Sequence, residues 1–357
     1  MAGLSMRIFK RLAVFLCANL LLSLALQFLL SAPSQQPIRY AEFERGEYNA
    51  VILGHSLAER GFAPAELQTE EGDRVFNFCI GGAPFHNLPY LLMGLQETHP
   101  LKKVYLELYW PYWTEKLYGV NYVDYDNQLL DMLPESARRA FIKEERLFEN
   151  YNKTLFPYKL DSGTLNQLGN LPEALRIKTD PRYREKSPEM LSIMNDPEEF
   201  GYGGDGFVYV KDGAGYLDGD YPFRQFSERK LSREAIEDFD RIVDFCRENG
   251  IELICLESAL LPIRLQNENH GESHDWFAAL CRSRNVAYYD MNYVDYALLP
   301  RGAEDYSDTD GHMAVHLARR QTGLLKQILQ SEEPDRFFEP DYEAVLAGME
   351  AYGVSNP

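Results

Sequence analysis

The chain has 357 residues, of which 45% are hydrophobic and 25% are charged. These proportions are those of an ordinary globular protein, and the length is ample for a buried core. The formal net charge is −19. Because nucleic-acid binding requires a basic surface for phosphate contacts, DNA or RNA is excluded as an expected partner.

The first segment, residues 1–32, has the pattern of a membrane anchor. Three basic residues come first, and the strongly apolar run Leu12–Ala32 then spans about 20 residues, roughly the length that crosses a hydrocarbon core. A cleaved signal peptide usually has an apolar region of only about 7–15 residues. The sequence therefore favours an uncleaved single-pass anchor, with a cleaved signal as the alternative. The basic residues before the span predict that residues 33–357 lie outside the cytoplasm, in the periplasm or the extracellular space.

Strand-like and helix-like segments alternate in the exported part, after a short polar tether at 33–47. A first block, residues 48–110, contains apolar runs that predict strands at 48–54, 74–80 and 102–110. A second block, residues 231–331, contains a helix with a start at Ser232 and a stop at Gly250, strands at 251–258 and 286–291, and a closing helix at 312–330. Alternation of this kind predicts an α/β fold, a flavodoxin-like three-layer structure around a parallel sheet.

The alternation is interrupted between the two blocks. Residues 111–230 are rich in Tyr, Asp and Gly, and they predict a large, partly irregular insertion after the third strand that covers the site or contacts a partner. Residues 332–357 form a C-terminal extension.

Three features predict a serine nucleophile at the carboxyl ends of the strands, where such sheets bind ligands. Ser56 follows the first strand, and Gly81 and Gly82 follow the second, where backbone N–H groups can approach an oxyanion. The late segment "YSDTDGHMA" supplies His312 as a base, with Asp310 or Asp308 to hold its ring.

This arrangement resembles the SGNH/GDSL hydrolase superfamily, and within it the membrane-anchored branch that acylates cell-envelope polymers. That branch includes the D-alanyl-lipoteichoic acid biosynthesis protein and the alginate and peptidoglycan O-acetyltransferases. "LGHS", "NFCIGG" and "DTDGH" stand at the nucleophile, glycine and acid–histidine blocks. The resemblance implies that Gly82 or Gly81 forms the oxyanion hole together with the Ser56 amide. The family spacing favours Asp310, with Asp308 held in reserve.

The sequence departs from the family at two blocks. His55 stands where the family often has Asp, and "LELYWPYW" lacks the Asn that commonly completes the oxyanion hole. His55 and His86, which lies just beyond the glycine turn, are further candidates for binding the substrate.

The five cysteines form no CxxC or CxxH pair, and they do not have the pattern of a disulfide scaffold. His316 lies one turn after His312 but has no acidic or cysteine ligand at a matching spacing. No metal site and no cofactor are therefore expected.

The sequence predicts an extracytoplasmic serine acyl-esterase or O-acyltransferase that acts on cell-envelope polysaccharide through an acyl-enzyme. The resemblance implies a membrane-bound O-acyltransferase as a partner, with a glycan or an acyl ester as the substrate. The alternative is a non-catalytic, SGNH-like subunit that binds glycan or serves as a scaffold in an acylation complex.

Overall fold

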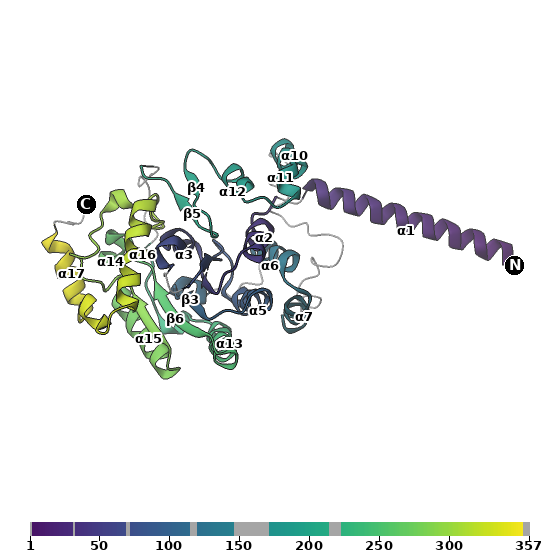
Figure 1. Ribbon diagram of the computed structural model, residues 1–357. Coiled ribbons are helices and arrows are strands. Elements are labelled where there is room, and N and C mark those ends of the chain that lie inside the picture. The colour runs from purple at the N-terminus through teal and green to yellow at the C-terminus, as the bar shows by residue number, and fades with distance from the viewer. Residues whose placement is uncertain are drawn as a thin grey trace.

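A five-stranded parallel sheet forms the centre of the protein. The structure is a computed structural model, and it describes residues 2–30, 33–68, 72–114, 120–145, 171–213 and 223–352. The strands are β1 (Ala50–Leu53), β2 (Val75–Asn77), β3 (Lys103–Glu107), β6 (Glu252–Glu257) and β7 (Ala287–Asp290). Their order is β2-β1-β3-β6-β7, and every neighbouring pair is parallel (Figure 1). The predicted parallel α/β fold is confirmed.

Helices cover both faces of this sheet (Figure 1). Successive side chains of a strand point to opposite faces, so Val51 and Leu53 of β1 pack in one apolar core, and Ala50 and Ile52 pack in a second. The first core contains side chains of α5 (Leu88–Thr98), α13 (Arg233–Asn249) and α15 (His270–Ser283). The second contains side chains of α3 (Ser56–Gly61), α4 (Pro64–Leu67) and α16 (Val315–Leu329).

Helix α13 shows how local sequence sets an element's ends. Ser232 accepts a hydrogen bond from the N–H of Ala235, and Gly250 ends the helix with a φ of +67°. Both are the boundaries that the sequence predicts, because a serine cap satisfies a free N–H and only glycine adopts this φ at little cost. Cys246 is buried on its apolar face, and all five cysteines of the chain are free.

Residues 33–47 do not form the polar tether that the sequence suggested. Residues 36–45 form helix α2 (Gln36–Arg45), and Ile38, Arg39 and Phe43 on it are almost completely buried. The buried guanidinium of Arg39 donates hydrogen bonds to the carbonyls of Asn77 (2.6 Å), Cys79 (2.7 Å) and Gly206 (3.0 Å) and to a Glu59 carboxylate oxygen (2.9 Å). This helix is therefore part of the folded body.

The described parts of the insertion 111–230 contain five α-helices and a two-stranded antiparallel hairpin, and residues 115–119, 146–170 and 214–222 lie outside the description. The elements are α6 (Val120–Met132), α7 (Glu135–Glu144), α10 (Leu171–Thr179), α11 (Pro181–Arg184), α12 (Glu189–Met194), β4 (Phe200–Tyr202) and β5 (Val208–Val210). Leu129, Leu133 and Phe141 join the same core as α5. Within the described residues, the segments of α6 and α7 thus pack on the sheet domain.

The remaining described elements are short or close the C-terminal end. Helix α14 (Pro262–Asn267) precedes α15, and α17 (Tyr342–Ala351) lies in the C-terminal extension. Val345 and Met349 of α17 are buried against the body. Short 3-10 helices cover Phe85–Asn87, Trp110–Trp113, Glu228–Lys230, Ala303–Asp305 and Pro334–Phe337.

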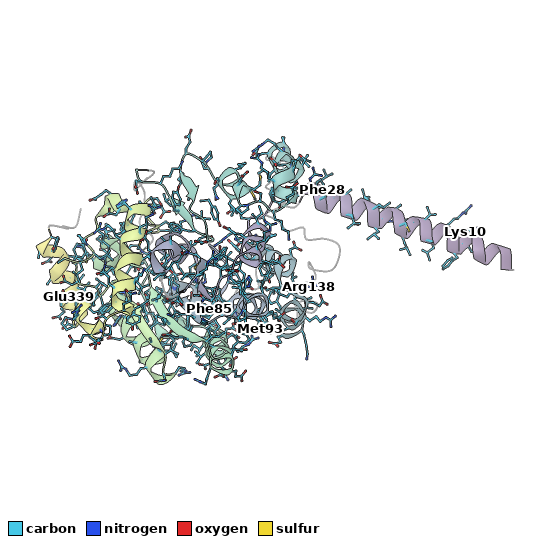
Figure 2. The ribbon with its side chains drawn as sticks, viewed as in Figure 1. Lys10, Phe28, Phe85, Met93, Arg138 and Glu339 are labelled. Carbon is cyan, nitrogen blue, oxygen red and sulfur yellow. The ribbon has the colours of Figure 1, made fainter. Side chains whose placement is uncertain are left out.

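Helix α1 (Ala2–Leu30) projects from the body as a single long helix (Figure 1). Its segment Ile8–Leu26 is long and apolar enough to cross a membrane, a property that signal sequences share. Lys10 lies near the far end, whereas Phe28 lies where the helix reaches the body (Figure 2). There the Lys178 ammonium of α10 donates a hydrogen bond to the Phe28 carbonyl at 2.5 Å.

The hydrogen bonds of Arg39 predict a large effect of its removal. Arg39→Met leaves Glu59 and three carbonyls without their cationic donor, and we expect the free energy of unfolding to fall by about 3–5 kcal/mol. Chemical denaturation of the full chain in detergent measures this change. Arg45→Met, on an exposed arginine of the same helix, is the control and should change it by about 0.5 kcal/mol or less. Equal effects of the two substitutions would show that Arg39 has no special role.

Candidate active site

Ser56 is the first residue of α3 and follows β1 after a two-residue turn. The turn is fixed by Glu107, a buried residue at the end of the neighbouring strand β3, whose carboxylate accepts the His55 N–H at 2.8 Å. Gly54 makes room for this carboxylate, because a Cβ at Gly54 would lie 2.8 Å from its Oε2. A buried acid thus holds the backbone that carries the serine.

The glycine turn after β2 lies directly beside Ser56. A Cβ at Gly81 would come within 3.3 Å of the Ser56 Cβ, so the two backbones approach closely. Gly82 has a φ of +76°, and a Cβ there would collide with the Tyr125 hydroxyl. Among the described residues, none accepts a hydrogen bond from the backbone N–H groups of Ser56, Gly81 or Gly82. These N–H groups are available to an oxyanion.

Asn77 holds α3 against this turn. Its side-chain amide donates to the carbonyls of Ala58 (3.0 Å) and Phe62 (2.9 Å), and its Oδ1 accepts the Cys79 N–H at 3.0 Å. One buried amide therefore joins the helix that begins with Ser56 to the strand end that leads to the glycines.

His312 is paired with Asp308. The His312 Nδ1 lies 2.5 Å from the Asp308 Oδ2, and the backbone N–H groups of Gly311 and His312 donate to the Asp308 Oδ1 at 3.0 and 3.1 Å. Gly311 has a φ of +88°, which folds the chain back over Asp308. The His312 Nε2 is buried and has no hydrogen-bond partner among the described residues.

The preference for Asp310 over Asp308 is corrected by this geometry. Asp310 is exposed, and the contact made by this residue is its backbone carbonyl, which accepts from Arg264 at 2.8 Å. Burial raises the pKa of Asp308, but the hydrogen bonds and the charge of His312 lower it by more than burial raises it. The pKa of Asp308 is therefore below its ordinary value. Asp308 is therefore an ionised partner for the ring.

The helix that begins with Ser56 packs against the helix that follows His312. Helix α3 begins with Ser56 and contacts α16, which starts three residues after His312. Just past α3, the Ala63 N–H donates to the Thr322 hydroxyl of α16 at 2.9 Å. The positive charge of Arg60 on α3 also lowers the pKa of Asp308.

Both histidines expected near the substrate are buried. The His55 ring is fully buried and stacks on Tyr112, with centroids 3.6 Å apart and an angle of 7° between the planes. The His86 Nε2 lies 3.3 Å from the Asp126 Oδ1. Both rings are held by protein side chains, and their role in binding the substrate stays a prediction. His316 bonds Asp212 and Asp305.

Tyr112 and Glu107 are site residues that the sequence did not single out. Burial raises the pKa of Tyr112 and a hydrogen bond with Ser56 lowers it, which leaves the pKa above 10. Tyr112 is therefore a neutral hydroxyl donor beside Ser56. It lies in the "LELYWPYW" segment at the end of β3, so a search of that segment for a hydroxyl donor would have found it.

The comparisons with known proteins give no family for this chain. No protein-family model matches it, and no curated protein matches it. A solved structure from Streptococcus pneumonia, described as a candidate platelet activating factor, is similar with a TM-score of 0.36 and 12% identity. The match covers 89% of this chain and 99% of that one.

The Asp308–His312 pair predicts a pH-dependent contribution to stability. The folded pKa of Asp308 is below the ordinary 3.8, so the pair stabilises the fold above pH 3.8 and this contribution is lost as the pH falls through the lower folded value. At pH 7, Asp308→Asn should reduce the free energy of unfolding by about 1 kcal/mol. Denaturation at pH 7 and in acid measures the difference, which should shrink in acid. Asp310→Asn is the matched control and should have no effect; a larger loss from Asp310→Asn would reverse the assignment.

Proposed function

We propose that the protein is a membrane-anchored serine esterase or O-acyltransferase of the SGNH type that acts outside the cytoplasm on cell-envelope polysaccharide. The observation that supports this proposal is that helices α3 and α16 pack together, with a candidate nucleophile at the start of one and a candidate base just before the other. On one side, Ser56 adjoins the glycine turn. On the other, His312 is bonded by Asp308 through Nδ1 and leaves Nε2 without a partner among the described residues.

The chemistry follows from these roles. The Ser56 hydroxyl attacks the acyl carbonyl carbon while the His312 Nε2 takes its proton, and Asp308 stabilises the imidazolium. The backbone N–H groups of Ser56 and of Gly81 or Gly82 bind the oxyanion. The intermediate then expels the alcohol or thiol, which receives the proton from His312, and an acyl-enzyme remains.

The second half of the reaction decides between transfer and hydrolysis. A sugar hydroxyl, or water, gives a proton to His312 and attacks the acyl carbon, and Ser56 leaves with that proton. Anchoring by α1 favours transfer on envelope glycans, since it keeps the enzyme beside acyl donors at the membrane. A membrane-bound O-acyltransferase is the proposed supplier of the acyl group.

Tyr112 takes part in this proposal as a third donor. Its hydroxyl bonds Ser56 and stays protonated at neutral pH because burial raises its pKa. It can therefore turn from Ser56 to the substrate oxygen and replace the amide of the missing Asn. Loss of one such donor typically reduces the rate by about 10²–10³.

Labelling of the full chain with a fluorophosphonate probe tests the nucleophile. We expect labelling of the wild type, none in Ser56→Ala, rates reduced by about 10⁴ or more in His312→Gln, and rates reduced by about 10²–10³ in Tyr112→Phe. Asp308→Asn should slow the reaction, whereas the control Asp310→Asn should not. Folding of each variant is checked by its thermal unfolding.

An unlabelled, folded wild type would contradict the enzyme proposal. Glycan binding by that protein would then favour the alternative of a scaffold or binding subunit. Labelling that survives in Ser56→Ala would place the reactive group elsewhere.

The anchor is tested separately. We expect mass spectrometry of the membrane fraction to find N-terminal peptides from before residue 33, and alkaline carbonate to leave the protein in the membrane. Deletion of 2–30 should release it, because no other described helix is long and apolar enough to span a membrane. A mature protein that begins near Pro33 would instead show a cleaved signal.

A further inference from the structure

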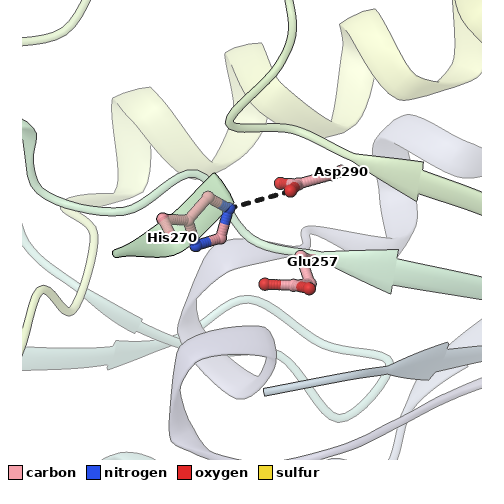
Figure 3. A group of neighbouring side chains, drawn as sticks. All are labelled: Glu257, His270 and Asp290. Atoms are coloured by element: carbon pink, nitrogen blue, oxygen red, sulfur yellow. Dashed lines mark hydrogen bonds and ion pairs between the residues drawn. The ribbon is translucent and has the colours of Figure 1, made fainter. Parts of the chain in front are cut away.

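A second group of ionisable side chains lies at the other end of the sheet edge that carries Ser56. Glu257 ends β6, Asp290 ends the adjacent strand β7, and His270 begins α15. All three are buried, with exposed fractions of 2–3%. One ligand atom from each lies within 4.8 Å of the others, and the three side chains converge (Figure 3). Strand β3 separates this group from β1 and the serine.

Neighbouring groups fix the direction of the two carboxylates. The Asp290 Oδ1 accepts from the Asn292 N–H (2.9 Å) and side-chain amide (2.7 Å), which leaves Oδ2 to face the histidines. The Glu257 Oε1 accepts from the Tyr288 hydroxyl at 2.6 Å. Metal-binding carboxylates are commonly oriented in this way by hydrogen bonds from residues behind them.

A second histidine, His274, lies beside this group and bonds the same aspartate. The His270 Nε2 and the His274 Nδ1 lie 2.8 and 2.9 Å from the same oxygen, the Asp290 Oδ2. Residues four apart lie on one face of a helix, and a pair of histidines with this spacing is a common metal-binding pattern. The His274 side chain is 20% exposed, which gives the group a route to solvent.

We propose that His270, Glu257 and Asp290 bind a divalent cation, with Zn²⁺ as the best fit and His274 beside the site as a hydrogen-bond partner of Asp290. Two buried carboxylates so close together repel one another and lose their hydration, and a divalent cation neutralises both. Imidazole nitrogen and carboxylate oxygen are ordinary zinc ligands at about 2.0–2.2 Å, and two such atoms on a tetrahedral ion are roughly 3.3 Å apart. The distance between the His270 Nε2 and the Asp290 Oδ2 is 2.8 Å, so it would have to increase by about half an ångström for the ion to take the place of the shared proton.

The proposed site is structural, because its three ligands are all buried and none faces an open surface where a substrate could bind. It would join the start of α15 to the ends of β6 and β7. The absence of cysteine pairs led to the expectation of no metal site, but that pattern does not test a site built from histidine and carboxylates.

Zinc binding by the full chain in detergent tests the site. The protein is stripped with a chelator, dialysed against Zn²⁺ and measured by mass spectrometry of metals, with the Kd obtained by competition against a chromogenic chelator. We expect one equivalent per chain and a higher unfolding temperature with zinc. Asp290→Asn and Glu257→Gln preserve the side-chain shape, and each should weaken binding by 10-fold or more.

Two control variants separate this site from other histidines. His99→Gln removes a histidine that bonds the Phe43 carbonyl, and His316→Gln removes the one that bonds Asp212 and Asp305. Both should bind zinc as the wild type does. A folded, stripped wild type that takes up no zinc would overturn the proposal, as would unchanged binding in Asp290→Asn and Glu257→Gln or its loss in His316→Gln. None of these outcomes depends on the reactivity of Ser56.

Discussion

The buried guanidinium of Arg39 is the interaction on which the arrangement of this protein depends. An arginine is almost never fully buried unless its charge and its N–H groups are satisfied. Here the guanidinium donates hydrogen bonds to carbonyls at the end of β2 and in the β4–β5 hairpin, and to the carboxylate of Glu59 on α3. The Glu59 carboxylate in turn borders Gly81. The Arg39 side chain therefore links α2, the insertion, and the region where Ser56 lies beside Gly81.

Carboxylates at the ends of adjacent strands serve different purposes along one edge of the sheet. Glu107 at the end of β3 holds the turn before Ser56 by accepting a backbone N–H. Glu257 and Asp290 at the ends of β6 and β7 face histidines. The carboxyl edge of a parallel sheet collects such groups because successive strands end side by side there. One edge thus provides both the candidate nucleophile and the proposed zinc site.

Local features of the sequence predicted the sheet and several boundaries, such as the helix between Ser232 and Gly250, because apolar runs and capping residues act within a few positions. The same local features predicted that Ser56 and Gly81 lie close together, because each follows the carboxyl end of one of two neighbouring strands. It missed α2, since Arg39 and Glu42 make the segment look solvated and the carbonyls that bury Arg39 come from distant segments. It favoured Asp310 over Asp308 because spacing alone does not reveal the turn at Gly311. The histidines of α15 went unnoticed, as Glu257 and Asp290 join them only in three dimensions.

The contact between α1 and the insertion has a mechanical consequence. The Lys178 ammonium of α10 donates a hydrogen bond to the Phe28 carbonyl, and this contact ties the end of α1 to the folded body. If α1 spans a bilayer as proposed, this contact would limit how far the Ser56 region can move from the membrane surface. Such an enzyme would modify polymer only within a thin layer close to the membrane surface, and chains farther out would have to be drawn down to it.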